Sequence, residues 1–345
     1  MAETTVPRLS ARWTVVAHDA DTVEFRTGVW NSRNVTLQDE ERRGILWPAV
    51  TLLKNGVAPK EIARTVGVRA GDLNDTLDNM RDLGLVVDAP ESALDAYLEE
   101  APSLGHDDGF RFDRVVLTGD PSMVANVRSQ LDASLRQPRI DVVEFPSAPS
   151  AAGYAAWEDS LVREGEAEKY LPYRRSLMVA VTASNDPDRF RFLDLVASMV
   201  GFTWLHATID GPFLFVGPTV IPGQSASYRD FESRVAMNLR ERESYLKFKS
   251  ALASERHLKA HGNVVPPLAS LVASFTALEV VNLVECGTAP TLNKVLSIYV
   301  PTMEIAYQEV LPLPGGEDGP FARRDATALY FDAREWLLDP RLDAE

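Results

Sequence analysis

Short alternating runs of apolar and polar residues open the chain and predict β-strands. Trp13–His18 and Thr22–Arg26 flank the turn Asp19-Ala20-Asp21, as the two strands of a hairpin would. Asn34–Leu37 has the same alternation and is a third expected strand. The start of the chain is therefore expected to form a small sheet of three strands.

Helical patterns follow these strands. Asp39 and Glu40 supply acidic residues for the start of a helix that ends near Asn55-Gly56, and Pro48 should kink that helix or delay its start. A short second helix opens at Pro59, and a third is expected over Asp72–Leu83. Its apolar stripe consists of Leu73, Leu77, Met80 and Leu83. Three strands and three helices predict an α+β winged helix-turn-helix domain over residues 1–90.

Strands and helices alternate in the rest of the chain, after an acidic linker at 91–111. The strands are expected at Arg114–Gly119, Ile140–Phe145, Ser176–Thr182, Thr203–Ile209, Phe213–Val216, Val295–Val300 and Ile305–Leu311. The helices are expected at Ser122–Leu135, Pro187–Val200, Phe231–Ser254 and Pro267–Val284. This alternation predicts a doubly wound α/β domain with a parallel sheet over residues 112–345.

Composition narrows the classes of function. The net charge of −15 repels phosphate backbones, so nucleic acid is not an expected partner. We find no apolar signal core at the start and no run of about 20 consecutive apolar residues, so we expect a cytoplasmic protein with no membrane partner. Cys286 is the only cysteine, which excludes an intramolecular disulfide and a multi-thiolate metal site.

The turn after the first α/β strand lacks the features of a phosphate-binding loop. Such a loop needs several glycines, because its backbone must approach the phosphates closely. Here the turn reads Gly119-Asp120-Pro121, in which the aspartate adds negative charge and the proline removes an amide donor. Glu144 lies where a ribose-binding acid would follow, but a carboxylate at a strand end is common. We therefore expect no nucleotide cofactor.

Two other features resemble catalytic or metal sites without completing one. His257 and His261 are spaced to share a helix face, but Leu258 replaces the glutamate of a HExxH motif, and both histidines suit the end of a helix before Gly262. Cys286 is expected to be a partly buried structural thiol. No set of residues suggests a catalytic triad, so we expect neither catalytic residues nor a metal.

The segment Val216–Arg234 resembles a signature of ThiF-like, ubiquitin-activating-enzyme-like proteins that partner YcaO cyclodehydratases. The family pattern is GP-x-x-x-PG-x-T-x-C-Y-x-C-L-x-x-R, and the matching residues here are Gly217, Pro218, Pro222, Gly223, Tyr228 and Arg234. Ser227 and Asp230 occupy the two cysteine positions. Downstream, Val310–Pro314 resembles the segment before a second cysteine pair, where this chain has Gly316 and Gly319.

The missing cysteines change what this resemblance implies. The family's structural zinc needs four good ligands, so we expect no zinc here. The loop should be held instead by packing around Pro222, Tyr228 and Phe231. The helix Pro267–Val284, with Leu278-Glu279, also fits the family pattern.

The N-terminal region resembles a PqqD-like domain, the recognition element for ribosomally synthesised, post-translationally modified peptides. In such domains a leader peptide adds as a strand beside the third strand and packs against the third helix. Carried over to this chain, the resemblance implies a groove between Arg33–Leu37 and Asp72–Leu83, with Val35 and Leu37 on the core face. The expected peptide-binding residues are Arg33, Asn34, Val35, Thr36, Leu37, Asn74, Leu77, Asp78 and Arg81.

Together the two resemblances imply a non-catalytic partner of an ATP-dependent enzyme. The chain would bind a precursor peptide and present it to a YcaO-type cyclodehydratase, as in the formation of thiazoles and thiopeptides. Two alternatives stay open: an active ThiF-like adenylating enzyme, and a winged-helix DNA-binding regulator. The acids Asp72, Asp75, Asp78 and Asp82 on the expected recognition helix argue against the regulator. The sequence does not decide whether the chain forms a homodimer.

Overall fold

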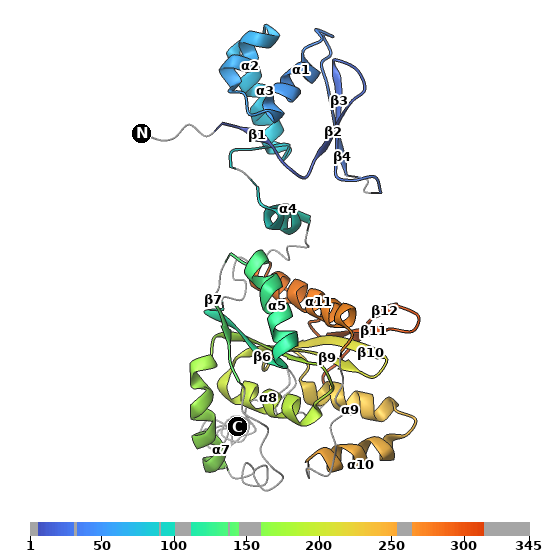
Figure 1. The fold of residues 1–345 in the computed structure, drawn as a ribbon. Helices are drawn as coiled ribbons and strands as arrows, with labels where there is room; N and C mark the ends of the chain where they lie inside the picture. Colours follow the sequence, from blue (N-terminus) through green and yellow to red (C-terminus); the bar gives the residue numbers. More distant parts are fainter. Residues whose placement is uncertain are drawn as a thin grey trace, which may run out of the picture. The chain divides into compact units, whose positions relative to one another are not determined.

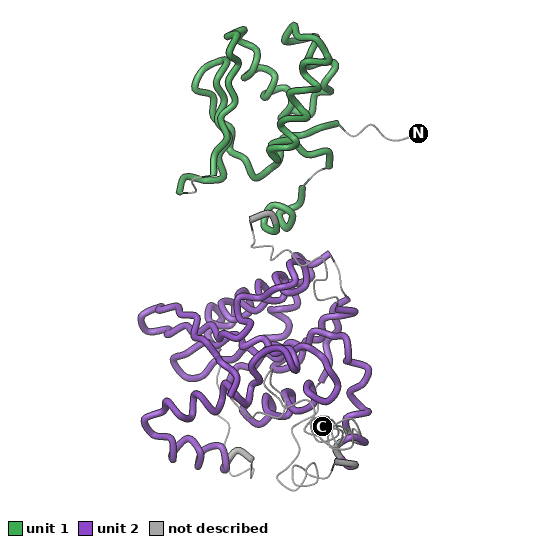
Figure 2. The backbone as a smooth tube through the Cα atoms, turned by 180° about the vertical axis from the view of Figure 1, so that it is seen from behind, with its two compact units in different colours: residues 1–102 green, residues 103–345 purple. Residues whose placement is uncertain are grey.

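The computed structural model describes residues 6–30, 33–89, 91–100, 112–136, 139–144, 160–253 and 264–313. The chain divides into two compact units, residues 1–102 and 103–345, which are coloured separately in Figure 2. Each unit has its own sheet and its own buried core.

The N-terminal unit combines two small sheets with three packed helices (Figure 1). Its three-stranded antiparallel sheet has the order β2 (Thr14–Ala17), β3 (Thr22–Arg26), β4 (Asn34–Gln38). A second sheet pairs β1 (Arg8–Leu9) with β5 (Val86–Val87), and sequence reasoning missed both of these strands. The helices are α1 (Leu46–Lys54), α2 (Pro59–Val66) and α3 (Ala70–Asp82).

Proline and glycine set the helix ends in this unit. The expectation that Pro48 delays the first helix is confirmed, because α1 begins at Leu46 and Pro48 falls in its first turn, where no intrahelical donor is needed. Pro59 is the first residue of α2, and Gly67 ends that helix with a φ of 76°, a left-handed conformation that favours glycine. Within the expected linker, α4 spans Ala93–Glu100, and residues 101–111 lie outside the described part of the chain.

The core of the N-terminal unit lies between the three-stranded sheet and the helices. Phe25 and Val23 of β3 are fully buried against side chains of all three helices. The predicted apolar stripe of the third helix holds for Leu73, Leu77 and Met80. It is wrong for Leu83, which is 48% exposed, because the helix ends at Asp82 and the chain turns at Gly84.

The C-terminal unit is built on a seven-stranded sheet with the order β12-β11-β10-β9-β8-β6-β7. The strands are β6 (Arg114–Gly119), β7 (Arg139–Val142), β8 (Ser176–Thr182), β9 (Thr203–Asp210), β10 (Phe213–Val220), β11 (Lys294–Tyr299) and β12 (Glu304–Glu309). The expected all-parallel sheet is wrong: β6 to β9 are parallel, but β10, β11 and β12 are antiparallel to their neighbours. The turns at 211–212 and 300–303 are too short for a parallel crossover.

Helices cover both faces of this sheet (Figure 1). One face carries α5 (Pro121–Ser134) and α11 (Pro266–Glu285), and the other carries α7 (Ser160–Ala167), the 3-10 helix η1 (Glu168–Tyr173), α8 (Pro187–Val200), α9 (Tyr228–Asn238) and α10 (Arg242–Ala253). The single helix expected over Phe231–Ser254 is therefore two helices, α9 and α10, separated by a break at 239–241.

The helix α11 is the one described helix long and apolar enough to cross a membrane by length and composition, with a mean hydropathy of 1.6. In the structure it packs along α5 and against β9 and β10, and its inward face includes the fully buried Val272 and Val280. Glu279 and Asn282 are also buried on this helix. The helix thus serves as a core element of the sheet in this fold.

Candidate functional site

The strand β4 is an edge of the N-terminal sheet. Within the described residues it pairs with β3 on one side and has no strand on the other. Two hydrogen bonds at its ends set the pattern of the ladder: the N–H of Asp39 donates to the carbonyl of Asp21, and the N–H of Thr27 donates to the carbonyl of Arg33. Both bonds continue the β3–β4 register, in which Thr22 lies opposite Gln38 and Arg26 lies opposite Asn34.

This pattern identifies the backbone groups that point away from the sheet. In an antiparallel pair, hydrogen-bonded and non-hydrogen-bonded residues alternate, so the odd-numbered residues of this stretch bond to β3. The N–H and C=O groups of Asn34, Thr36 and Gln38 therefore face the open edge. An edge of this kind can accept one further strand.

The side chains of β4 alternate between the core and the surface. Val35 and Leu37 pack against the core of the N-terminal unit, while Asn34, Thr36 and Gln38 are exposed. The amide Nδ2 of Asn34 lies 3.4 Å from a carboxylate oxygen of Glu24. A visiting strand would thus meet polar side chains on one face and the rim of an apolar core on the other.

The peptide-binding residues predicted on the third helix differ in their exposure. Asn74 and Asp78 are exposed on α3, whereas Leu77 is buried in the core with 3% of its surface exposed. The guanidinium of Arg81 forms ion pairs with Asp78 and, at 3.1 Å, with Asp88. Arg81 is therefore already engaged within α3 and the segment after β5, and Arg33 is exposed just before β4.

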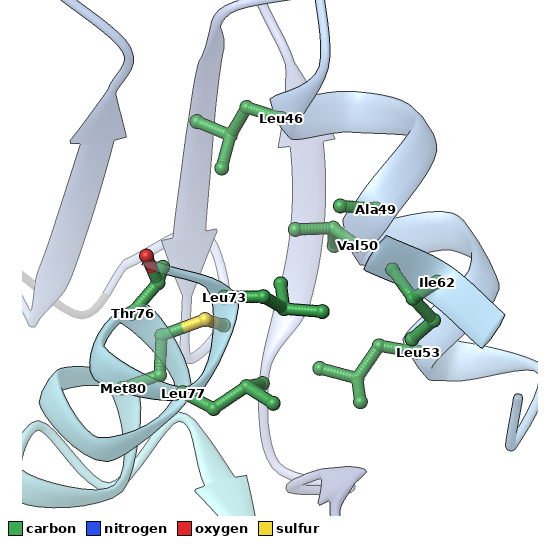
Figure 3. Close-up of a pocket in the computed structure, with 9 residues that line it drawn as sticks. All are labelled: Leu46, Ala49, Val50, Leu53, Ile62, Leu73, Thr76, Leu77 and Met80. Atoms are coloured by element: carbon green, nitrogen blue, oxygen red, sulfur yellow. The ribbon is translucent and has the colours of Figure 1, made fainter. Parts of the chain in front are cut away.

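A small apolar crevice lies between the three helices of the N-terminal unit (Figure 3). Its volume is about 20 Å³, close to the space that one water-sized group needs. Its lining residues are Leu46, Ala49, Val50, Leu53, Ile62, Leu73, Thr76, Leu77 and Met80. In Figure 3 the side chains of α1 and α2 face those of α3 across this space, which suits a small apolar group.

The turn Gly119-Asp120-Pro121, which the sequence predicts not to bind phosphate, borders a larger cavity. About 540 Å³ of space lies beside the carboxyl ends of β6 and β7 and the start of α5. Thr118, Gly119, Pro121, Val124, Ala125, Arg128, Val142, Val143, Glu144 and Arg189 line it. Sequence reasoning did not predict this cavity, because the space forms only where β6, β7, α5 and Arg189 of α8 meet in the fold.

The residues of the turn are occupied by contacts within the fold. A Cβ atom at Gly119 would lie 1.9 Å from the carbonyl oxygen of Val181, so the close approach of β8 requires this glycine. The carboxylate of Asp120 accepts a hydrogen bond from the backbone N–H of Ala183. The glycine and the aspartate therefore tie β6 to the end of β8.

The two positions where the family resemblance places cysteines form a hydrogen-bonded clasp. The Ser227 hydroxyl accepts from the N–H of Asp230 at 3.1 Å, and Asp230 Oδ2 accepts from the N–H of Ser227 at 2.9 Å, which is a capping box for α9. The other oxygen, Oδ1, accepts from the N–H of Leu313 at 3.0 Å. One buried carboxylate thus joins the start of α9 to the chain after β12.

A zinc ion does not fit this arrangement. Ser227 offers a neutral hydroxyl in place of a thiolate, and the carboxylate oxygens of Asp230 already accept hydrogen bonds. Among the described residues, no three His, Cys, Asp or Glu side chains gather as a metal site would require. Gly316, Gly319, His257 and His261 lie outside the described residues.

Packing and a further carboxylate also hold this loop. Tyr228 is buried, with its ring centroid 5.6 Å from that of Phe190, and Phe231 packs beside it at 5.8 Å. Asp194 of α8 accepts hydrogen bonds from the N–H groups of Tyr228 at 3.0 Å and Arg229 at 3.2 Å. Sequence reasoning missed Asp194, because nothing near it in the chain signals this contact.

Cys286 lies at the end of α11 and is partly buried, as expected. Burial raises the pKa of its thiol, and the neighbouring charge of Glu285 raises it further. A raised thiol pKa lowers the fraction of reactive thiolate at neutral pH, so this environment does not activate the sulfur as a nucleophile.

The molecule belongs to the class of mixed α/β proteins with a large mixed sheet, preceded by a small α+β unit. No protein-family model matches the sequence, and no curated protein matches it. Solved structures do match. The heterocyclase TruD is similar with a TM-score of 0.59 and 17% identity, over 90% of this chain and 42% of that chain.

Two further structures are similar. A heterocyclase in complex with substrate and cofactor has a TM-score of 0.59 and 18% identity, over 90% of this chain and 39% of that chain. Escherichia coli MccB with ATP has a TM-score of 0.48 and 12% identity, over 89% of this chain and 98% of that chain. The chain therefore shares its fold with part of the heterocyclases and spans about two fifths of their length.

Proposed function

We propose that this chain is the non-catalytic recognition and scaffold subunit that delivers a ribosomal precursor peptide to a YcaO-type cyclodehydratase in the cytoplasm. The N-terminal unit acts as a PqqD-like recognition element that binds the leader peptide. The C-terminal unit is a degenerate ThiF-like scaffold that docks on the enzyme. The enzyme then forms azoline or thiazole rings at Cys, Ser or Thr of the core peptide.

The open edge of β4 is the observation that carries this proposal. Three residues with outward backbone groups, Asn34, Thr36 and Gln38, supply a ladder for one guest strand. Backbone pairing provides affinity for many sequences, and nearby side chains provide the selection. The fold that the chain shares with TruD, a protein named as a heterocyclase, supports the same class of process.

Scaffolding explains the remaining features of the site. The residues of the Gly119–Pro121 turn hold β6 and β8 together, and the Ser227–Asp230 clasp stabilises a loop. Neither arrangement leaves a nucleophile beside a base. Holding the leader on one unit raises the effective concentration of the core peptide at a separate active site.

Substituting Thr36 tests the recognition step. Thr36→Pro removes one outward N–H while leaving the bonds of Val35 and Leu37 to β3, and Thr36→Ala keeps that N–H. With a synthetic leader peptide that binds the wild-type chain, we expect Thr36→Pro to weaken binding about tenfold or more, and Thr36→Ala to stay within about twofold. Isothermal titration calorimetry measures both. Equal affinities for the two variants, or unchanged affinity after deletion of residues 1–90, would exclude peptide recognition at this edge.

A second candidate, an active ThiF-like adenylating enzyme, is favoured by the cavity beside β6 and β7. Its position matches the place where open α/β sheets bind nucleotides, and Arg128, Arg189 and Glu144 line it. The two hypotheses differ in one assay. The scaffold hypothesis expects no ATP–pyrophosphate exchange by the isolated chain with precursor peptide, and exchange above background would favour the enzyme.

A further inference from the structure

The most exposed large apolar side chains of the N-terminal unit lie at one end of the β4 edge. Trp30 is 98% exposed and Val29 is 79% exposed, both in the connection between β3 and β4. A fully exposed tryptophan is unusual in a soluble domain, since indole burial contributes strongly to stability. Trp30 is not part of the core of this unit, so its indole is accessible to a partner.

The connection places Trp30 next to the start of the open edge. Arg26 ends β3 and Asn34 begins β4, directly opposite each other in the register, so the loop that carries Trp30 closes this end of the hairpin. A guest strand paired with β4 would lie about 4.8 Å from it. Its residues just beyond Asn34 would therefore pass within reach of an indole on the loop.

The strand β4 is short, so a peptide longer than this strand must extend beyond it at one end or both. The strand has five residues, of which three present outward backbone groups. A longer guest must leave the ladder at Asn34 or at Gln38. At the first of these ends the chain offers two exposed apolar side chains, and at the second it continues into the charged residues Asp39, Glu40 and Glu41.

We propose that Trp30, together with Val29, is the specificity-determining anchor that binds an aromatic or large aliphatic side chain of the peptide, just outside the stretch paired with β4. This proposal rests on the proposed function, because it assumes a guest strand on that edge. Backbone pairing alone reads no sequence, whereas an indole that becomes buried on binding selects for an apolar partner. The occupant is thus a peptide with an apolar residue flanking its β-forming segment.

Selection from a phage-displayed library of random 16-residue peptides on the immobilised full chain tests this anchor. We expect the wild-type chain to enrich peptides with an aromatic or large aliphatic residue at a fixed offset from a β-forming stretch. Trp30→Ala should lose that preference and weaken binding of a selected peptide about tenfold or more, and Trp30→Phe should keep most of both. Trp47→Ala, at a tryptophan of α1 that is 39% exposed, is the matched control and should retain the preference.

Testing Thr36→Pro in the same selection distinguishes the Trp30 anchor from peptide pairing with β4. If Trp30→Ala selects the same peptides with the same affinity as the wild type while Thr36→Pro weakens them, the anchor is wrong and peptide recognition stands. If Thr36→Pro binds the selected peptides as well as Thr36→Ala does, the edge does not pair with the guest and both ideas fall. A wild-type chain that enriches no peptide also overturns both.

Discussion

His206 is a titratable residue enclosed by aromatic rings. It lies on β9 with its ring centroid 4.7 Å from that of Phe190 and 5.2 Å from that of Tyr228. Its Nδ1 atom has no hydrogen-bond partner among the described residues, and burial lowers the pKa of the imidazole to about 3. The neutral ring packs as an aromatic residue, so protonation is compatible with the unfolded chain but not with this core.

This burial predicts a pH dependence of stability. The unfolded imidazole has an ordinary pKa of 6.5, so the contribution of His206 is complete above pH 6.5 and is lost as the pH falls towards 3. Comparing pH 7.5 with pH 5, the free energy of unfolding should drop by about 2 kcal/mol more in the wild type than in His206→Phe. Urea denaturation of both proteins at the two pH values measures this. Parallel pH profiles would show that the imidazole is solvated.

At the scale of elements, one carboxylate joins segments that are distant in the chain. Asp230 lies in the first turn of α9, and its side chain also accepts a hydrogen bond from the N–H of Leu313, 83 residues away. The backbone N–H groups at the start of α9 are satisfied by Asp194 of α8. Hydrogen bonds and a capped helix therefore hold this loop.

The clasp can be tested by substitution. Asp230→Ala leaves the N–H groups of Leu313 and Ser227 without their acceptor, and the lost cap and buried hydrogen bonds should cost about 2 kcal/mol of unfolding free energy. Asp230→Asn keeps one acceptor oxygen and should cost less. The exposed neighbour Arg229→Ala is the control and should change little. A chelator should leave the denaturation midpoint of the wild type unchanged. A lower midpoint with chelator would show that a metal holds the loop.

At the scale of the whole molecule, the chain has two compact units, and the proposed recognition and scaffolding roles fall on separate units. The N-terminal core of Phe25, Ile62 and Leu85 is complete within residues 1–102, and the seven-stranded sheet belongs to residues 103–345. The net charge of −15 is a property of the entire chain and favours solubility over binding to nucleic acid. Two cores of this kind should unfold as two cooperative units.

Separate expression of residues 1–102 and 103–345 tests this independence. We expect each fragment to fold and to show a single thermal transition. Each midpoint should lie within about 5 °C of the matching transition of the full chain, because a change of about 1 kcal/mol in unfolding free energy shifts the midpoint of such a domain by a few degrees. Circular dichroism and differential scanning calorimetry provide the midpoints. An unfolded N-terminal fragment would mean that its core needs the rest of the chain.

The sequence by itself determined the local elements, because hydrophobic periodicity and the ends set by Pro and Gly depend on only a few neighbouring residues. The strands β3 and β8 and the helix α8 lie where the pattern predicts them, residue for residue. The two faces of β4 were also predictable from the sequence, since Val35 and Leu37 alternate with polar residues.

Only the tertiary structure decided the direction of β10 to β12, the break between α9 and α10, and the outward direction of the Thr36 backbone. It also brought Asp194 to α9 and Asp230 to Leu313. These features depend on which distant segments meet, and no local period encodes that choice. Pairing across many residues is set by the packing of the complete core, which forms only when the chain folds.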